Sequence, residues 1–269
     1  MAQNNILNKE FADESIIRSM LLPEYKGVKI RIVQQTDSTN EQMKKAALSG
    51  EGEISVLIAE SQSAGRGTKG RSFYSPADTG CYMSILLRPT YTVGECTLLT
   101  TAAAAATAEA IEKLTGRKTG IKWVNDIIVD KRKVAGILTE GSIKKDLSGL
   151  DWAVVGIGVN IREPENGFPD EIKKIAGTLC GNGDEIKNCL IAEIINIFLN
   201  YYGRLTQKQF IEQYRKRLFF LGNEITVTQG ENTYKATAVD IDSMCRLIVK
   251  DTEGNERVLN AGEISIRPV

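Results

Sequence analysis

The amino-acid sequence predicts an α+β body followed by a small all-β domain. Strand-like and helix-like patterns are mixed up to residue 218, whereas the chain after Gly222 carries only short strand-like runs. The length of 269 residues also exceeds the usual size of one domain. We therefore expect an N-terminal extension over residues 1–25, a main domain over 26–221 and a β domain over 222–269.

The N-terminal part of the chain contains a short amphipathic segment from Phe11 to Leu22, which Pro23 ends. Apolar residues alternate from Val28 to Gln34, which predicts a strand. Ser38 and Glu41 have the spacing of a capping box, with Ser38 as N-cap, so a helix should begin there and end at Gly50.

The middle of the chain continues the alternation of strands and helices. Residues 61–71 are rich in glycine, serine and cations and should form a loop. Gly116 follows an alanine-rich helix as its C-cap, and a return strand should end at Gly136-Ile137-Leu138. The predicted strands are 54–60, 81–87, 121–124, 127–129 and 152–161, and the predicted helices are 97–114, 186–205 and 207–218.

The chain after Gly222 contains five short strand-like runs separated by turn residues. These runs cover residues 224–229, 233–241, 245–250, 255–259 and 263–267. Their spacing predicts a small β-barrel or sandwich.

Composition excludes several classes of chemistry. The absence of histidine removes Ser–His–Asp and Cys–His nucleophile systems and histidine metal sites. The five cysteines form no CxxC pair, so we expect buried free thiols and not disulfides or a zinc site. Equal numbers of cationic and anionic residues, 34 each, give no general preference for nucleic acid. No signal peptide or membrane span is recognisable, which predicts a cytoplasmic protein without a membrane partner.

The loop Gly65–Arg71, with the sequence GRGTKGR, carries three glycines and three arginines or lysines. Glycine lets the backbone approach a ligand closely, and the cations provide a field for an anion. The spacing is that of neither a Walker A loop nor a dinucleotide GxGxxG motif. On spacing alone, an anion-binding loop and a flexible surface loop are equally good interpretations.

Two further segments place polar or small residues in apolar strands. Asn125 and Asp126 interrupt the run KWVND, and Lys133 stands shortly before Gly136. The cations around Lys133 also suit a solvated hairpin turn. The run Gly156–Asn160, GIGVN, leaves room for a flat ligand, although close helix packing explains its two glycines equally well.

Four segments, in this order and spacing, resemble the biotin protein ligase family. They are Ser38–Asn40, the stretch from Ser61 through Ser75-Pro76, Lys122–Asp126 with Lys133 and Gly136–Leu138, and Val155–Asn160. The ending Gly262–Arg267 is similar to the SH3-like C-terminal domain of that family. The resemblance covers about residues 28 to 269 and implies a class II aminoacyl-tRNA synthetase-like catalytic domain with a mixed sheet.

The resemblance implies an ATP-dependent ligase that acts in two steps. Biotin and ATP form biotinyl-5′-AMP and pyrophosphate, and a lysine of a biotin carboxyl carrier protein or biotin-dependent carboxylase then attacks the mixed anhydride. Neither step needs histidine. Cations would stabilise the approach of two anions, and Mg²⁺ would be held mainly by the phosphates, with Asp126 nearby.

The resemblance also implies the site residues, position by position. The catalytic residues are Lys133, Arg66 and Arg71. The biotin-binding residues are Ser38, Thr39, Asn40, Gln62, Arg66, Gly67, Thr68, Lys133, Gly136, Gly156 and Gly158. The ATP-binding residues are Arg66, Thr68, Lys69, Arg71, Asn125, Asp126 and Asn160, and no residue set dedicated to a metal is expected.

Three positions depart from the family pattern. Thr68 stands where an arginine usually helps to hold the acyl-adenylate, so either Lys69 compensates or the intermediate leaks. Val124 replaces a usual proline, and Phe73 replaces a frequent tryptophan. Neither of these two changes should alter the chemistry.

The N-terminal region predicts the monofunctional type, because it is too short for a DNA-binding winged-helix domain. No DNA partner is expected, and a homodimer is left open.

The sequence leaves two alternative functions. A lipoate or octanoate ligase-type enzyme would share the fold but lacks this loop joined to KWxND. A non-catalytic biotin sensor would bind both substrates without releasing pyrophosphate, and Thr68 is the feature in its favour.

Overall fold

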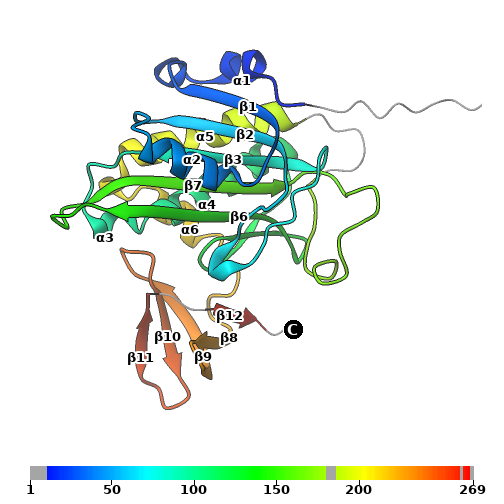
Figure 1. Ribbon diagram of the computed structural model, residues 1–269. Coiled ribbons are helices and arrows are strands. Elements are labelled where there is room, and N and C mark those ends of the chain that lie inside the picture. Colours follow the sequence, from blue (N-terminus) through cyan, green and yellow to red (C-terminus); the bar gives the residue numbers. More distant parts are fainter. Residues whose placement is uncertain (1–10, 180–185, 261–262, 267–269) are drawn as a thin grey trace, which may run out of the picture.

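The computed structural model describes residues 11–179, 186–260 and 263–266 and contains two sheets (Figure 1). The strands of the larger sheet are β1 (Lys29–Thr36), β2 (Ser55–Gln62), β3 (Gly80–Leu87), β4 (Gly120–Lys122), β5 (Asp126–Val129), β6 (Arg132–Ile143) and β7 (Leu150–Asn160). The helices are α1 (Glu14–Met20), α2 (Thr39–Leu48), α3 (Val93–Cys96), α4 (Leu99–Thr115), α5 (Lys187–Gly203) and α6 (Phe210–Arg215). No helix in these ranges combines the length and the apolar character needed to cross a bilayer.

The larger sheet is mixed, as expected. Its strand order is β1-β2-β3-β7-β6-β5-β4, with β1 and β2 parallel and the other neighbours antiparallel. The two longest strands, β6 and β7, pair over most of their length near the centre of the sheet. Residues from both strands therefore present one continuous surface on each face.

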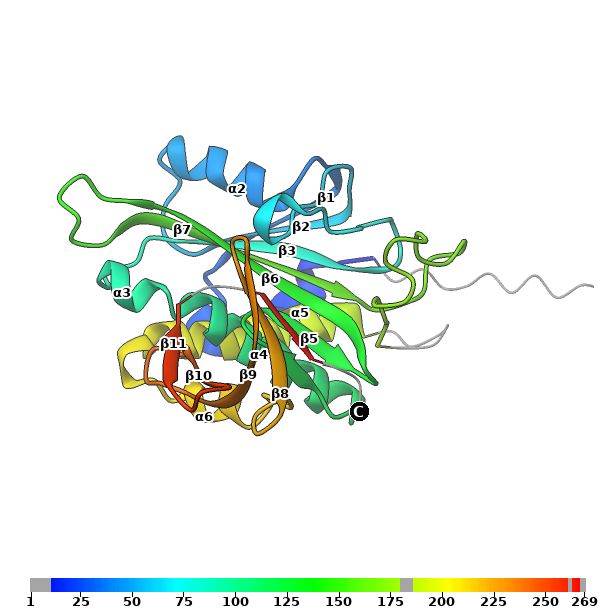
Figure 2. The same cartoon turned by 90° about the horizontal axis from the view of Figure 1, so that it is seen from below.

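The two faces of this sheet are covered differently (Figure 2). Helices α4, α5 and α6 lie on one side and enclose the large hydrophobic core. Residues Ala102 to Ala106 of α4 are fully buried in it, because a methyl side chain allows a helix to pack closely against its neighbours. Helix α2 covers part of the other face over a small cluster that includes Met43, Leu86 and Trp152. The rest of that face is left for the site.

Helix α1 is held on α5 by two asparagine side chains. Asn188 accepts a hydrogen bond from the Asp13 amide at 2.8 Å, and its own amide group donates to the Phe11 carbonyl at 3.1 Å. Asn196 contacts Leu22 and Met20 in the same way. Ile17 and Leu21 enter the large core. The segment that the sequence placed in an N-terminal extension thus packs against the main domain.

The C-terminal strands form a five-stranded antiparallel sheet in the order β11-β10-β9-β8-β12. Their bounds are β8 (Glu224–Gln229), β9 (Asn232–Ile241), β10 (Leu247–Asp251), β11 (Glu256–Leu259) and β12 (Glu263–Ile266). The indole nitrogen of Trp123 donates to the Cys245 carbonyl at 3.0 Å, which joins this sheet to the body. The predicted five strands are confirmed, while Gly262 and Arg267 of the C-terminal motif lie outside the described residues.

Several predicted elements differ from the structure. The capping box at Ser38 is wrong: Ser38 is the N-cap, but its side chain makes no capping bond. The reciprocal bond is also absent, because the Ser38 amide donates to Asp37 and Glu41 is engaged in ion pairs with Arg66 and Lys44. The return strand does not end at Leu138, because β6 continues to Ile143 against β7. The last helix is shorter than predicted and covers only Phe210–Arg215.

The run predicted as a strand over 121–124 also stops early. Strand β4 ends at Lys122, and the peptide bond between Trp123 and Val124 is cis. The α+β body with a separate C-terminal β sheet is confirmed.

Candidate active site

A pocket of about 970 Å³ opens on the α2 side of the larger sheet. Its walls come from the start of α2, the loop after β2, strands β5 to β7, the segment 168–176 and the connection to β8. The residues predicted from the sequence that line it are Ser38, Thr39, Asn40, Gln62, Arg66, Gly67, Thr68, Arg71, Asn125, Asp126, Lys133, Gly136, Gly156, Gly158 and Asn160. Of the predicted set, Lys69 is the residue that does not line this pocket.

One end of the pocket is built from uncharged hydrogen-bonding groups. The Gln62 side-chain oxygen accepts from both the amide and the hydroxyl of Thr39, at 2.8 and 3.1 Å. Its nitrogen donates to the Ser75 hydroxyl at 2.9 Å. The Ser38 hydroxyl makes no capping bond and lines the pocket. Fixed donors and acceptors of this kind suit a polar, uncharged ring.

Asn40 is anchored beneath this end on both sides of its amide group. Its oxygen accepts from the buried hydroxyl of Ser84 at 2.6 Å. Its nitrogen donates to the Leu138 carbonyl at 3.3 Å and to Glu140 at 2.9 Å. Asn40 therefore joins α2 to β3 and β6. Ser84 escaped sequence analysis because nothing in the pattern of a buried strand marks one of its serines.

The predicted glycines on β6 and β7 make space for other side chains. A Cβ atom on Gly156 would overlap the Asn40 side-chain oxygen. A Cβ atom on Gly158 would lie 2.7 Å from the Phe73 ring, well inside van der Waals contact. Phe73 in turn packs edge-on against Tyr82, with ring centroids 6.3 Å apart. The glycines thus let the loop after β2 lie close to the floor of the pocket.

The loop over residues 65–73 is a narrow hairpin at the pocket mouth. The Phe73 amide donates to the Gly65 carbonyl at 2.8 Å, and the Gly67 amide donates to the Arg71 carbonyl at 2.7 Å. Arg71 also reaches the Thr68 carbonyl at 3.4 Å. Lys69, at the tip, has a positive φ of 57°. The predicted loop is confirmed, and its conformation is defined by its own backbone bonds.

The opposite end of the pocket is cationic. Lys133 forms an ion pair of 2.6 Å with Asp126, and both groups are partly exposed. The Asn125 side chain donates to the Ile137 carbonyl at 2.8 Å, which holds it beside β6. Lys133 also pairs through its backbone with the segment around Ala176, and this pairing brings that segment to the pocket wall.

The lining contains cations that sequence analysis missed. These are Lys122, Lys131 and Lys174, which line the pocket together with Arg66, Arg71 and Lys133. Asp126 and Glu224 are the acidic residues of the lining. The pocket therefore carries a net positive charge and suits an anionic ligand. Lys174 lies in an irregular segment whose position depends on pairing with Lys133, which no sequence pattern revealed.

The described cysteines play no part in this site. Cys81, Cys96, Cys189 and Cys245 are free, and none of them lines the pocket. Burial raises the pKa of the Cys81 thiol to about 12 and that of the Cys245 thiol to about 11. Cys81, Cys96 and Cys245 are buried, as predicted, whereas Cys189 is only partly buried, and Cys180 lies outside the described residues.

Comparison with known proteins identifies the family. Residues 32–160 match the Biotin/lipoate A/B protein ligase family, and residues 220–267 match the Biotin protein ligase C terminal domain. The chain is 31% identical over 256 residues to the Bifunctional ligase/repressor BirA of Bacillus subtilis, a match that covers 92% of this chain and 77% of the relative. The chain belongs to the biotin protein ligase family.

Other members of the biotin protein ligase family are similar to this chain over nearly its whole length. The Biotin--[acetyl-CoA-carboxylase] ligase of Mycobacterium tuberculosis is 29% identical over 262 residues, covering 94% of each chain. The structure of biotin protein ligase from Aquifex aeolicus in complex with biotin and ATP superimposes with a TM-score of 0.71 at 25% identity, covering 90% of this chain and 99% of that one.

Proposed function

We propose that this chain is an ATP-dependent ligase that activates biotin as biotinyl-5′-AMP and transfers it to a lysine of a carboxylase carrier domain. The observation that carries the proposal is the two-ended pocket, in which Ser38, Thr39 and Gln62 provide uncharged hydrogen-bonding groups at one end and Lys133 provides a cation at the other. The bicyclic ureido ring of biotin matches the first end, and the triphosphate of ATP matches the second. The ligases named in the comparisons act on, or are bound to, the same molecules.

The adenylation step joins two anions. A carboxylate oxygen of biotin attacks the α-phosphorus of ATP, the bond from that phosphorus to the bridging oxygen breaks, and pyrophosphate leaves. Lys133 is our candidate for stabilising the charge at the reacting carboxyl and α-phosphate oxygens, because its ammonium group lines the pocket at the cationic end. To do so it must exchange its ion pair with Asp126 for the substrate.

The transfer step needs no covalent intermediate on the protein. The neutral amine of the carrier lysine attacks the carbonyl carbon of biotinyl-AMP, the amide bond forms, and AMP leaves with the electrons of the anhydride bond. The amine releases a proton in the same step. Arg71, which lines the pocket mouth, is our candidate for holding the α-phosphate of the leaving AMP.

Binding roles are proposed for the remaining residues of the two ends. Ser38, Thr39 and Gln62 would bind the ureido ring. Asn125 and Asn160 would contact the nucleotide, while Gly67 and Thr68 would cover the adenylate from the loop. We also propose that the main domain covers residues 26–221 and that the C-terminal domain begins at residue 222.

The residues present fit a magnesium ion that is held mainly by phosphates. No group of three or more acidic or cysteine side chains with metal-ligating spacing occurs among the described residues, and Asp126 offers a single carboxylate in the pocket. Mg²⁺ commonly uses one or two carboxylates together with substrate phosphates. When bound, the ion would neutralise charge on the triphosphate.

Exchange of labelled pyrophosphate into ATP tests the proposal. We expect exchange that requires biotin, is absent with lipoate, and falls at least a hundredfold in Lys133→Ala, on the scale of losing one transition-state contact. Lys145→Ala is the matched control, since Lys145 is exposed and lies outside the pocket lining. Exchange with lipoate alone would assign the chain to the lipoate ligases. Biotin binding without exchange would favour a sensor.

A further inference from the structure

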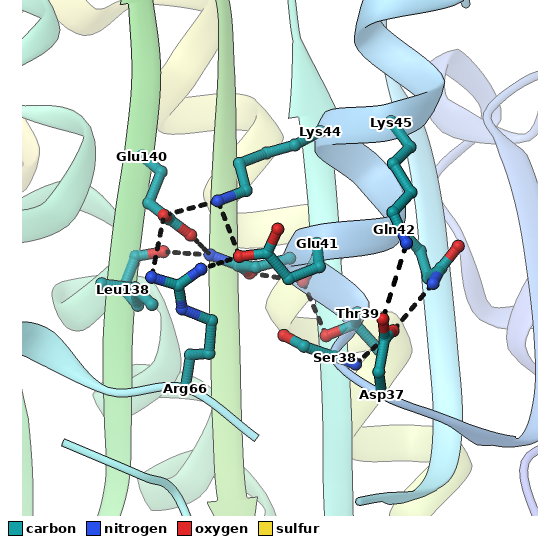
Figure 3. Close-up of polar contacts among 12 residues, drawn as sticks. Asp37, Ser38, Thr39, Glu41, Gln42, Lys44, Lys45, Arg66, Leu138 and Glu140 are labelled. Atoms are coloured by element: carbon teal, nitrogen blue, oxygen red, sulfur yellow. Dashed lines mark hydrogen bonds and ion pairs between the residues drawn. The ribbon is translucent and has the colours of Figure 1, made fainter. Parts of the chain in front are cut away.

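Arg66 lies between two carboxylates at the polar end of the pocket (Figure 3). Its guanidinium group forms an ion pair with Glu41 of α2 and lies 4.0 Å from Glu140 of β6. Lys44 contacts the same two carboxylates, at 2.8 and 2.9 Å. Two cations and two carboxylates thus form a group, here called the clasp, whose charges balance.

The clasp is anchored in the fold on the side away from the loop. Glu140 also accepts a hydrogen bond from Asn40 at 2.9 Å. Burial raises the pKa of Glu140, but the hydrogen bonds from Asn40 and Lys44 and the charges of Lys44 and Arg66 outweigh this, so the pKa lies below its ordinary value. Glu140 is therefore ionised at neutral pH and available to Arg66.

On the other side, Arg66 belongs to the hairpin at the pocket mouth. Its backbone pairs with Ser72, and the neighbouring Gly65 and Gly67 carry the bonds that close the hairpin. The Arg66 side chain runs from this hairpin to α2 and β6. The contact therefore spans the mouth of the pocket at its biotin end.

We infer that Arg66 is a positioning residue, which ties the loop across the biotin end of the pocket through Glu41 and Glu140, and that the anionic groups of the substrates are bound by other cations of the lining. This inference rests on the proposed function and refines the catalytic role that the sequence suggested for Arg66. Glu41 and Glu140 become determinants of biotin affinity although neither of them lines the pocket.

The charge balance favours this assignment over direct contact with a substrate anion. If Arg66 turned to a substrate carboxylate or phosphate, Glu41 and Glu140 would share Lys44 as their remaining cation in the clasp. Both carboxylates are more than two-thirds shielded from solvent, with exposed fractions of 29% and 23%. Partly buried carboxylates that lose a cationic partner are destabilised.

Calorimetric titration with biotin and with biotinol, the uncharged alcohol analogue, tests the inference without ATP. We expect Glu41→Gln and Arg66→Ala to weaken the binding of both ligands by the same factor, about tenfold, which corresponds to roughly 1.4 kcal/mol of binding free energy. Glu14→Gln is the matched control, because Glu14 pairs with Arg18 on α1, away from the pocket. Loss of biotin binding with unchanged biotinol binding would overturn the inference, since Arg66 would then bind the carboxylate.

Charge exchange within the clasp supplies the second readout. The double variant Arg66→Glu with Glu41→Arg should recover most of the biotin affinity that Arg66→Glu alone loses. In pyrophosphate exchange, Glu41→Gln should raise the biotin concentration for half-maximal rate about tenfold and change the maximal rate less than twofold. A folded double variant without recovery, or a fall in maximal rate alone, would contradict a positioning role. A parent protein that binds no biotin would instead defeat the proposed function.

Discussion

The hydroxyl of Ser84 donates to the side-chain oxygen of Asn40 across 2.6 Å, in a position where Ser84 is fully buried. The same hydroxyl lies 2.7 Å from the Thr39 hydroxyl. Strand β3 thereby fixes the first turn of α2, on which the polar end of the pocket depends. A residue that does not line the pocket thus determines the orientation of two that do.

Ser84→Ala should lower the free energy of unfolding by about 1–3 kcal/mol, because the Asn40 oxygen would remain buried without its donor. Biotin affinity should fall as well, since Thr39 and Asn40 lose their common anchor. Chemical denaturation and biotin titration measure the two effects. Ser19→Ala, at an exposed position of α1, should change stability by less than about 0.5 kcal/mol. Equal effects of the two variants would refute the anchoring role.

Gly156→Ala should weaken biotin binding at least tenfold and lower the free energy of unfolding by about 1–3 kcal/mol, because the added methyl group would displace Asn40. Gly94→Ala is the matched control: a Cβ atom there meets nothing within 4 Å, and the position lies in helix α3. That variant should be neutral or slightly more stable. Full biotin affinity in Gly156→Ala would show that Asn40 can move without consequence.

Lys187→Met should destabilise the protein by about 3–5 kcal/mol, because it leaves the buried carboxylate of Glu60 without its cation. The two groups are 2.7 Å apart and each is 3% exposed. Glu60 also binds the Ala12 amide, so the attachment of the N-terminal segment should loosen. Lys173→Met, which breaks the exposed pair with Asp170, should cost less than about 1 kcal/mol. Denaturant unfolding that ranks the two variants equally would contradict this expectation.

Asp37 should contribute to stability in a pH-dependent manner. Hydrogen bonds from the Gln42 side chain and the Ser38 amide lower the pKa of Asp37 to about 2. Its contribution is complete above the pKa of an unfolded aspartate, about 4, and is lost as the pH falls through 2. The stability difference between the parent and Asp37→Asn should therefore shrink between pH 4 and pH 2. A difference that stays constant over this range would exclude the contribution.

The sequence predicted most of the fold because apolar periodicity and turn residues are local signals. The strand over Cys81–Leu87 and the five C-terminal strands lie where their alternation placed them. The capping box failed because Glu41 has a partner, Arg66, from a distant loop. The extension of β6 to Ile143 depends on pairing with β7, which residues 139–143 do not reveal by themselves.

The candidate site was found through the family resemblance, and the structure added what only tertiary contacts define. Lys174 reaches the pocket because its segment pairs with Lys133. Ser84 contributes to the site because its hydroxyl contacts Thr39 and Asn40 on α2. Composition alone excluded histidine chemistry, but it could not separate the cations that line the pocket from Lys69, which does not.

The far wall of the pocket includes Phe219 and Asn223, from the connection between α6 and β8, and Glu224, the first residue of β8. A nucleotide that contacts this wall also holds the connection against the body of the protein. A carrier protein that shifts the C-terminal sheet would then be coupled to the nucleotide, and by thermodynamic reciprocity each would change the affinity for the other by the same factor. Binding of one substrate at the small β domain would in this way change the affinity of the pocket for another substrate.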